Sequence, residues 1–247
     1  MTNTKQIAIL LYPGFTALDA LGPYEVFKML PDAEIRFVAH EPGPIATDRG
    51  ILHVGATHSF EETSNPYLIL VPGSEAHTIT AMADQRLIDW IKHVHQSSTW
   101  TASVCSGALV LGAAGVLNGL PATTHWAAQS ALGRFGARAM PSERVVRAGK
   151  VWTSAGVSAG IDLAFSLFGE IAGRQEAEVA QLLIEYDPQP PFSAGHQSKA
   201  SEAVRARAAS EMARLSKNPR NVASVVKLMW RQAIERSRRA LKRRAAW

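Results

Sequence analysis

Short apolar runs alternate with longer amphipathic stretches through the first 120 residues, and this alternation constrains the fold more than any other feature. Four runs have the length and composition of buried strands: QIAILLY (6–12), EIRFVAH (34–40), YLILVPG (67–73) and TWTASVC (99–105). The stretches between them place their apolar residues at helical spacing: 16–30, 84–96 and 106–117. Continuous apolar strands alternating with helices indicate a mostly parallel sheet with helices on both faces. We therefore expect an α/β fold.

The second half of the chain continues with different elements. Residues 143–156 read as a β-hairpin that turns at Ala148 and Gly149, and residues 159–173 have the apolar spacing of a core-facing helix. A further helix, 176–186, ends at an Asp-Pro pair. The Pro/Gly-rich segment 187–197 then marks a boundary. We predict a single α/β domain over residues 1–195 and a helical C-terminal extension over residues 196–247.

The basic charge of the chain is confined to this extension. Residues 196–247 hold 14 Lys/Arg against 3 Asp/Glu, a net charge of +11, whereas residues 1–195 hold 12 against 18, a net charge of −6. The extension reads as two helices broken near SKNPRN (216–221), each with an apolar stripe beneath a basic face. A docked or dimer-stabilising helix pair fits this pattern. A nucleic-acid or membrane-surface role is the alternative, although we expect neither partner.

Cysteine usage and hydropathy indicate the compartment. The single cysteine cannot form an intramolecular disulfide, which fits a reducing environment. The N-terminal apolar run is interrupted at Pro13 and Gly14, too early for a signal peptide. Nowhere does an apolar stretch approach the roughly 18 residues that a membrane span requires. We expect a cytoplasmic protein.

That single cysteine, Cys105, stands where the fourth predicted strand passes into a helix. The small residues Ser106, Gly107 and Ala108 would let the helix begin at once, as in a nucleophile elbow. The helix N-terminus would lower the pKa of the thiol, since its free N–H groups favour an anion. The alternative is that Cys105 only packs in the core, because free cysteines are among the most buried residues. The elbow context favours a nucleophile.

A nucleophile of this kind needs a group that moves protons, and Asp19 stands among apolar residues in the helix after the first strand. The loops after the first, third and fourth predicted strands can converge at one edge of a parallel sheet. They carry Asp19, the VPGSEA turn (71–76) and Cys105. The N–H groups of Gly73, Ser74 and Ser106 would then form an oxyanion-type site. A helix cap or a surface position is the alternative for Asp19.

Other chemistry-bearing residues give weaker signals. His125 in ATTHW could approach the thiol, but a lone histidine at a strand end is typical of a structural hydrogen bond. Trp126, Trp152 and Val157 are candidates to shape a pocket, with packing as the alternative for the tryptophans. The histidines lack the accompanying ligands of a metal site, and there is no P-loop and no GxGxxG. We predict no metal site.

Taken in order, these motifs resemble the ThiJ/PfpI superfamily of glutamine-amidotransferase-like proteins, and within it the isocyanide hydratases. The resemblance covers roughly residues 5–195 and depends on an ordered set of short motifs: LDALGPYEVF, EPGP, VPG, SVCSGALVLGAAGVL, ATTHW, ERVVRAGKVWT, AGIDLAF and EYDPQPPFSAG. It implies a flavodoxin-like core, a homodimer and no cofactor. It also implies that Cys105 is the nucleophile and Asp19 the general acid/base. The isocyanide would be hydrated to an N-substituted formamide through a thioimidate.

Two features depart from the hydratase pattern. Residues 153–160 carry Ser154 and Ala155 where the hydratases are richer in glycine, which bears on the mobility of the helix that follows. Ser106 stands where a threonine is expected. The hydroxyl is retained, so a hydrogen bond from it to the carboxylate is expected to survive.

Three other functions remain possible within the resemblance. A peptidase of this superfamily would have a histidine directly after the cysteine, where this chain has Ser106. A glyoxalase or deglycase, which acts on reactive carbonyls, usually has a glutamate at the position of Asp19. A regulator of the AraC type would need two helix-turn-helix units, more than the 52 residues after Gly195 can supply.

Overall fold

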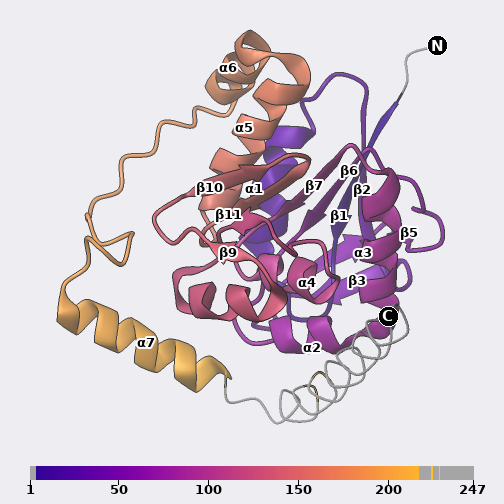
Figure 1. Ribbon diagram of the computed structural model, residues 1–247. Helices are drawn as coiled ribbons and strands as arrows, with labels where there is room; N and C mark the ends of the chain where they lie inside the picture. Colours follow the sequence, from indigo (N-terminus) through magenta and orange to yellow (C-terminus); the bar gives the residue numbers. More distant parts are fainter. Residues whose placement is uncertain (1–3, 217–223, 225–227, 229–247) are drawn as a thin grey trace, which may run out of the picture.

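A seven-stranded sheet forms the centre of the protein in the computed structural model, which describes residues 4–216, 224 and 228 (Figure 1). Its strands, in spatial order, are β10 (Val145–Ala148), β11 (Val151–Ser154), β7 (Trp100–Ser103), β6 (Leu68–Val71), β1 (Lys5–Leu10), β2 (Ala33–Ala39) and β5 (His58–Ser59). All neighbours pair in parallel except β10 and β11, which form the predicted antiparallel hairpin. The expectation of a mostly parallel α/β sheet is confirmed.

The order of the five central parallel strands explains where a site can form. From β2 through β1, β6 and β7 to β11, the order is that of the flavodoxin-like fold, in which the chain reverses direction across the sheet after the second strand. The connections from β1 and from β6 therefore leave opposite sides of the sheet at its carboxyl edge. This topology places a crevice at that edge between β1 and β6, and β7 is the next strand after β6.

Helices cover both faces of this sheet (Figure 1). They are α1 (Ala17–Phe27), α2 (Thr78–Ala83), α3 (Gln85–Ser97), α4 (Gly107–Ala113), the 3₁₀ helix η1 (Trp126–Phe135), α5 (Ala159–Ala172), α6 (Arg174–Leu183) and α7 (Glu202–Ser216). On one face α1 packs against α5, and on the other α3 packs against α4. The strands β1 and β6 between these layers are almost wholly buried, which explains their uninterrupted apolar sequence.

Several elements differ from the sequence-based expectation. The hairpin of β3 (Gly43–Ala46) and β4 (His53–Ala56), and the pair of β8 (Pro121–Ala122) and β9 (Arg138–Ala139), were not predicted because such short strands carry no clear periodicity. The first predicted helix of the extension corresponds to α7. The predicted break near 216–221 and the second helix lie outside the described residues, except for Ser224 and Leu228.

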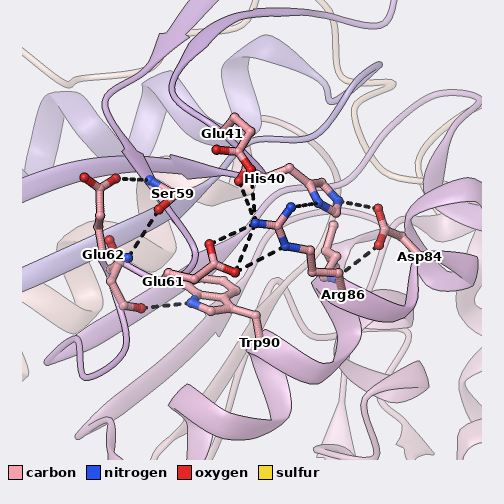
Figure 2. A network of polar contacts seen from close by, with 10 residues as sticks. His40, Glu41, Ser59, Glu61, Glu62, Asp84, Arg86 and Trp90 are labelled. Atoms are coloured by element: carbon pink, nitrogen blue, oxygen red, sulfur yellow. Dashed lines mark hydrogen bonds and ion pairs between the residues drawn. The ribbon is translucent and has the colours of Figure 1, made fainter.

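A network of polar side chains ties the β2/β5 edge of the sheet to the start of α3 (Figure 2). Asp84 caps α3 by accepting a 3.1 Å hydrogen bond from the Leu87 N–H, and it contacts His40 Nε2 at 2.6 Å. Arg86 pairs with Glu61 at 2.9 Å. Because the Arg86–Glu61 pair is the more exposed of the two, it contributes little to stability.

Candidate active site

Cys105 occupies the turn between β7 and α4, and its backbone is in the left-handed region, with a φ of 56°. This conformation is costly for a residue with a side chain, so the surrounding structure must hold it. The Cys105 N–H donates to the Ala155 carbonyl at 2.9 Å, and the Cys105 carbonyl accepts from Thr124 Oγ1 at 2.8 Å. The elbow is therefore clamped on both sides by segments distant in the sequence.

The residue type at position 107 is also dictated by this turn. A Cβ atom on Gly107 would lie 2.2 Å from the Val71 carbonyl oxygen, a distance that no real side chain tolerates. Glycine lets α4 begin directly against β6. The expectation that small residues allow a close approach between helix and strand is confirmed at this position.

Asp19 lies in the first turn of α1 and is fully buried. Its Oδ2 accepts a 2.8 Å hydrogen bond from the Gly73 N–H, and the Cys105 thiol is within hydrogen-bonding reach of the carboxyl. Oδ1 has no hydrogen bond to any described residue. Burial raises the pKa of Asp19 to about 7, although the hydrogen bonds from Gly73 and Cys105 oppose this rise and the Asp48 charge adds to it.

The pKa of the Cys105 thiol corrects one expectation. Burial raises this pKa well above its usual value, and the nearby charge of Asp19 raises it further. Hydrogen bonds from the Ser106 N–H and hydroxyl and from the Val157 N–H lower it, but they do not outweigh burial. The predicted lowering by the helix end is wrong because the thiol is only 5% exposed and faces a carboxyl group. The resting site therefore holds a thiol beside a carboxyl that titrates near neutral pH.

The loop after β6 also differs from expectation. Its amides were expected to form an oxyanion-type site, but the Gly73 N–H is bound to Asp19 and the Ser74 N–H donates to Ser106 Oγ at 3.0 Å. Ser106 Oγ also contacts the Ser74 carbonyl at 3.1 Å and Thr78 Oγ1 at 2.6 Å. The expected hydrogen bond from Ser106 to Asp19 is replaced by these contacts. The amides beside the thiol are those of Ser106 and Val157.

Three residues that support the site were missed by the sequence-based reasoning. Thr124 clamps the elbow carbonyl, as described above, and Thr78 binds the Ser106 hydroxyl. Tyr12 is buried, and its hydroxyl donates to the Pro72 carbonyl at 3.0 Å, next to the Gly73 amide that binds Asp19. The ATTHW motif contained a usable signal, because a threonine beside the elbow can satisfy its backbone. These contacts span 19 to 60 residues and have no periodic signature.

A cavity of about 580 Å³ opens onto Cys105 and Ser106. His125, Trp126 and Val157 line it. Burial lowers the pKa of His125, and its ring accepts a hydrogen bond from the Ala127 N–H at the start of η1. Trp152 does not line this cavity: its ring lies edge-on to Trp100, with the Arg147 guanidinium over it. The structure thus brings His125 and Val157 to the site and leaves Trp152 in the packing around β11.

Within the described part of the chain, no group of three or more His, Cys, Asp or Glu side chains could hold a metal ion. In the same residues, none of the helices has the length and apolar character to cross a membrane.

Comparisons with known proteins agree with this arrangement. Residues 5–170 match the sequence model of the DJ-1/PfpI family. An isonitrile hydratase from Pseudomonas putida is 40% identical over 199 residues, which cover 81% of this chain and 86% of the hydratase. The crystal structure of a ThiJ/PfpI family protein from Pseudomonas syringae matches with a TM-score of 0.84 and 37% identity over 90% of each chain.

A more distant similarity concerns a regulator. The HTH-type transcriptional regulator CdhR from Pseudomonas aeruginosa is 27% identical over 175 residues, which cover 68% of this chain and 51% of the regulator. The similarity therefore involves about half of that protein.

Proposed function

The chain belongs to the DJ-1/PfpI family, and we propose that it hydrates an organic isocyanide to the N-substituted formamide, with Cys105 as nucleophile and Asp19 as general acid/base. The observation that carries the proposal is the contact of a buried thiol with a buried carboxyl at the end of a cavity. The P. putida relative, named for isonitriles (isocyanides), supplies the substrate class.

The first step follows from the directions of the two pKa shifts. About half of the Asp19 carboxyls are ionised near pH 7 and most of them above it, whereas the raised pKa of the Cys105 thiol favours its protonated form. As sulfur attacks the terminal carbon of R–N≡C, Asp19 accepts the thiol proton and passes it to that carbon. A C–S bond and a C–H bond form, the S–H bond breaks, and the triple bond becomes a double bond. The product is the thioimidate Cys105–S–CH=N–R, with Asp19 ionised again.

The second step uses the same carboxylate. Asp19 accepts a proton from a water molecule whose oxygen adds to the thioimidate carbon, and passes that proton to the nitrogen. The tetrahedral adduct S–CH(OH)–NH–R then collapses: its O–H bond and the C–S bond break, the hydroxyl proton passes through Asp19 to the sulfur, and R–NH–CHO leaves. The Ser106 and Val157 N–H groups support both steps, because they stabilise negative charge on sulfur as it attacks and as it leaves.

The test is a turnover assay with an aryl isocyanide and with methylglyoxal side by side, on the wild type, Cys105→Ala and Cys105→Ser. We expect formamide from the isocyanide, no product with either variant, and an adduct on Cys105 that mass spectrometry detects. Isocyanide turnover by Cys105→Ala would reject the mechanism. Turnover of methylglyoxal alone would favour the glyoxalase- or deglycase-like alternative.

Other features of the proposal come from the resemblance to the hydratases. We propose a cytoplasmic homodimer that needs no cofactor, with residues 1–195 as the catalytic domain and residues 196–247 as an extension. Exposed apolar side chains on α6, those of Leu182 and Leu183, offer a surface for a second copy. Light scattering on the purified chain, with Leu182→Asp as the disrupting variant, measures the assembly. An unchanged mass in that variant would locate the contact elsewhere.

A further inference from the structure

One wall of the cavity over Cys105 comes from outside the α/β body. The body lines the cavity with residues between Thr16 and Val157, and the remaining lining residues are Ala209, Met212 and Ala213 of α7. Figure 1 shows α7 standing apart from the body, at the end of the long connection that follows α6. A segment of the C-terminal extension is therefore part of the candidate active site.

The side chains of α7 differ in how far they are exposed. The residues of α7 that are half-buried are Ala208, Glu211, Met212 and Leu215, whereas the other described side chains of this helix are exposed. These four residues are separated by three, one and three positions, so they lie in one stripe along the helix. Met212 is the largest side chain that α7 gives to the cavity.

Charged groups at the cavity rim add little to this apolar contact. Arg49 pairs with Glu75, which lines the cavity, at 3.0 Å. The charge of Arg49 also acts on Glu211 of α7, which pairs with Arg214 of its own helix at 2.9 Å. Arg49 and Arg214 are exposed and their two carboxylate partners are partly exposed, so the attraction is screened by salt. Met212 belongs both to the half-buried stripe and to the cavity lining.

The geometry of an isocyanide determines what this wall contacts. The R–N≡C group is linear, so a terminal carbon held at the Cys105 sulfur directs the organic group R away from the thiol. Apolar side chains from several elements line the space into which R extends, among them Ile79, Leu109, Trp126 and Met212. A cavity of about 580 Å³ falls within the range of pockets that bind drug-sized ligands. An apolar ring fits this space better than a small alkyl group.

We infer that α7 is a specificity-determining wall: Ala209, Met212 and Ala213 set the size of the organic group, and the substrates are isocyanides with an apolar, ring-sized substituent. This inference rests on the proposed function for the reaction, but the wall itself can be tested without it. The small side chains Ala209 and Ala213 leave room, and Met212 provides a flexible apolar surface against R.

The first experiment narrows the cavity from α7. Ala209→Leu and Ala213→Leu add three heavy atoms at the lining, and Ala206→Leu makes the same change at an exposed position of the same helix that does not line the cavity. We measure kcat/KM for 2-naphthyl isocyanide and isopropyl isocyanide. The two lining variants should lower the naphthyl-to-isopropyl ratio about tenfold or more, and Ala206→Leu should leave it unchanged. An unchanged ratio in both lining variants would overturn the inference.

A second readout separates the wall from the reaction. The rates at which N-(1-pyrenyl)maleimide and iodoacetamide alkylate Cys105 compare a bulky with a small reagent and require no hydration. Ala209→Leu and Ala213→Leu should slow the bulky reagent at least fivefold relative to the small one, whereas Ala206→Leu should not. If the wild type hydrates neither isocyanide, the proposed function fails and this ratio still decides whether α7 is the wall. Equal alkylation ratios in all four proteins would show that it is not.

Discussion

The amide of Gly73 donates a 2.8 Å hydrogen bond to Oδ2 of Asp19, joining the loop after β6 to the first turn of α1. This approach depends on the absence of a side chain. A Cβ atom on Gly73 would lie 2.6 Å from the Ser106 nitrogen and 3.0 Å from Asp19 Oδ2. The position of the carboxyl beside the thiol is therefore determined by backbone packing.

Gly73→Ala tests this dependence. The added methyl group must displace either the Asp19 carboxyl or the start of α4, so we expect kcat/KM for the isocyanide to fall about a hundredfold. Gly55→Ala is the matched control, because a Cβ atom there meets nothing within 4 Å. Wild-type turnover in Gly73→Ala would show that the carboxyl does not need this position.

The pH dependence of turnover follows from the pKa of Asp19. Below its pKa of about 7 the carboxyl is protonated and cannot accept the thiol proton, so kcat/KM should rise as pH increases through about 7. The midpoint belongs to the coupled pair of Asp19 and Cys105. The negative charge of Asp48 raises the Asp19 pKa, so Asp48→Asn should move the midpoint to lower pH. A profile of kcat/KM from pH 5 to 9 checks both statements, and a midpoint that moves upward would contradict the assignment.

The same pKa makes stability depend on pH. Because Asp19 titrates near 7 in the folded chain and near 3.8 when unfolded, the folded state binds more protons between these values. The free energy of unfolding contributed by this residue is therefore fully present below about pH 4 and is lost as pH rises through about 7. The full difference corresponds to roughly 4 kcal/mol. Asp19→Asn should lack this loss, so urea unfolding should show the variant gaining stability over the wild type from pH 4 to pH 8. If the free energies of unfolding of the variant and the wild type differed by the same amount at pH 4 and pH 8, the prediction would be contradicted.

The sheet could be predicted from the sequence because its strands leave a strong local signal. Uninterrupted apolar runs such as 67–73 occur where both faces of a strand are covered, and β6 is buried at every position. Cys105 and Asp19 could be proposed from the sequence for a different reason, since each is an unusual residue in its local pattern. The structure brings these two together, as the predicted loop arrangement required.

The electrostatics of the site could not be predicted in this way. Whether the Cys105 pKa rises or falls depends on the balance between burial and hydrogen bonds from Ser106 and Val157, which only the packed structure determines. The direction in which the Ser74 N–H points likewise depends on the backbone torsions of its loop, which cannot be predicted from the residue types alone. The position of α7 at the cavity could not be predicted either, because the residues it brings together are far apart in the chain and belong to no recognisable motif.

Thr124 provides the last test, because its hydroxyl binds the carbonyl of the strained Cys105 at 2.8 Å and is fully buried. Thr124→Val keeps the shape of the side chain but leaves that carbonyl without this partner, which should lower the free energy of unfolding by about 1–3 kcal/mol. Thr124→Ser retains the hydroxyl and loses only a methyl group. The turnover of isocyanide should fall in Thr124→Val more than in Thr124→Ser, because the elbow that aims the thiol at Asp19 loses one of its two clamps. Urea unfolding and kcat/KM on the two variants measure these effects. Equal stability and equal turnover in both would mean that Ala155, through its hydrogen bond to the Cys105 amide, holds the elbow without help.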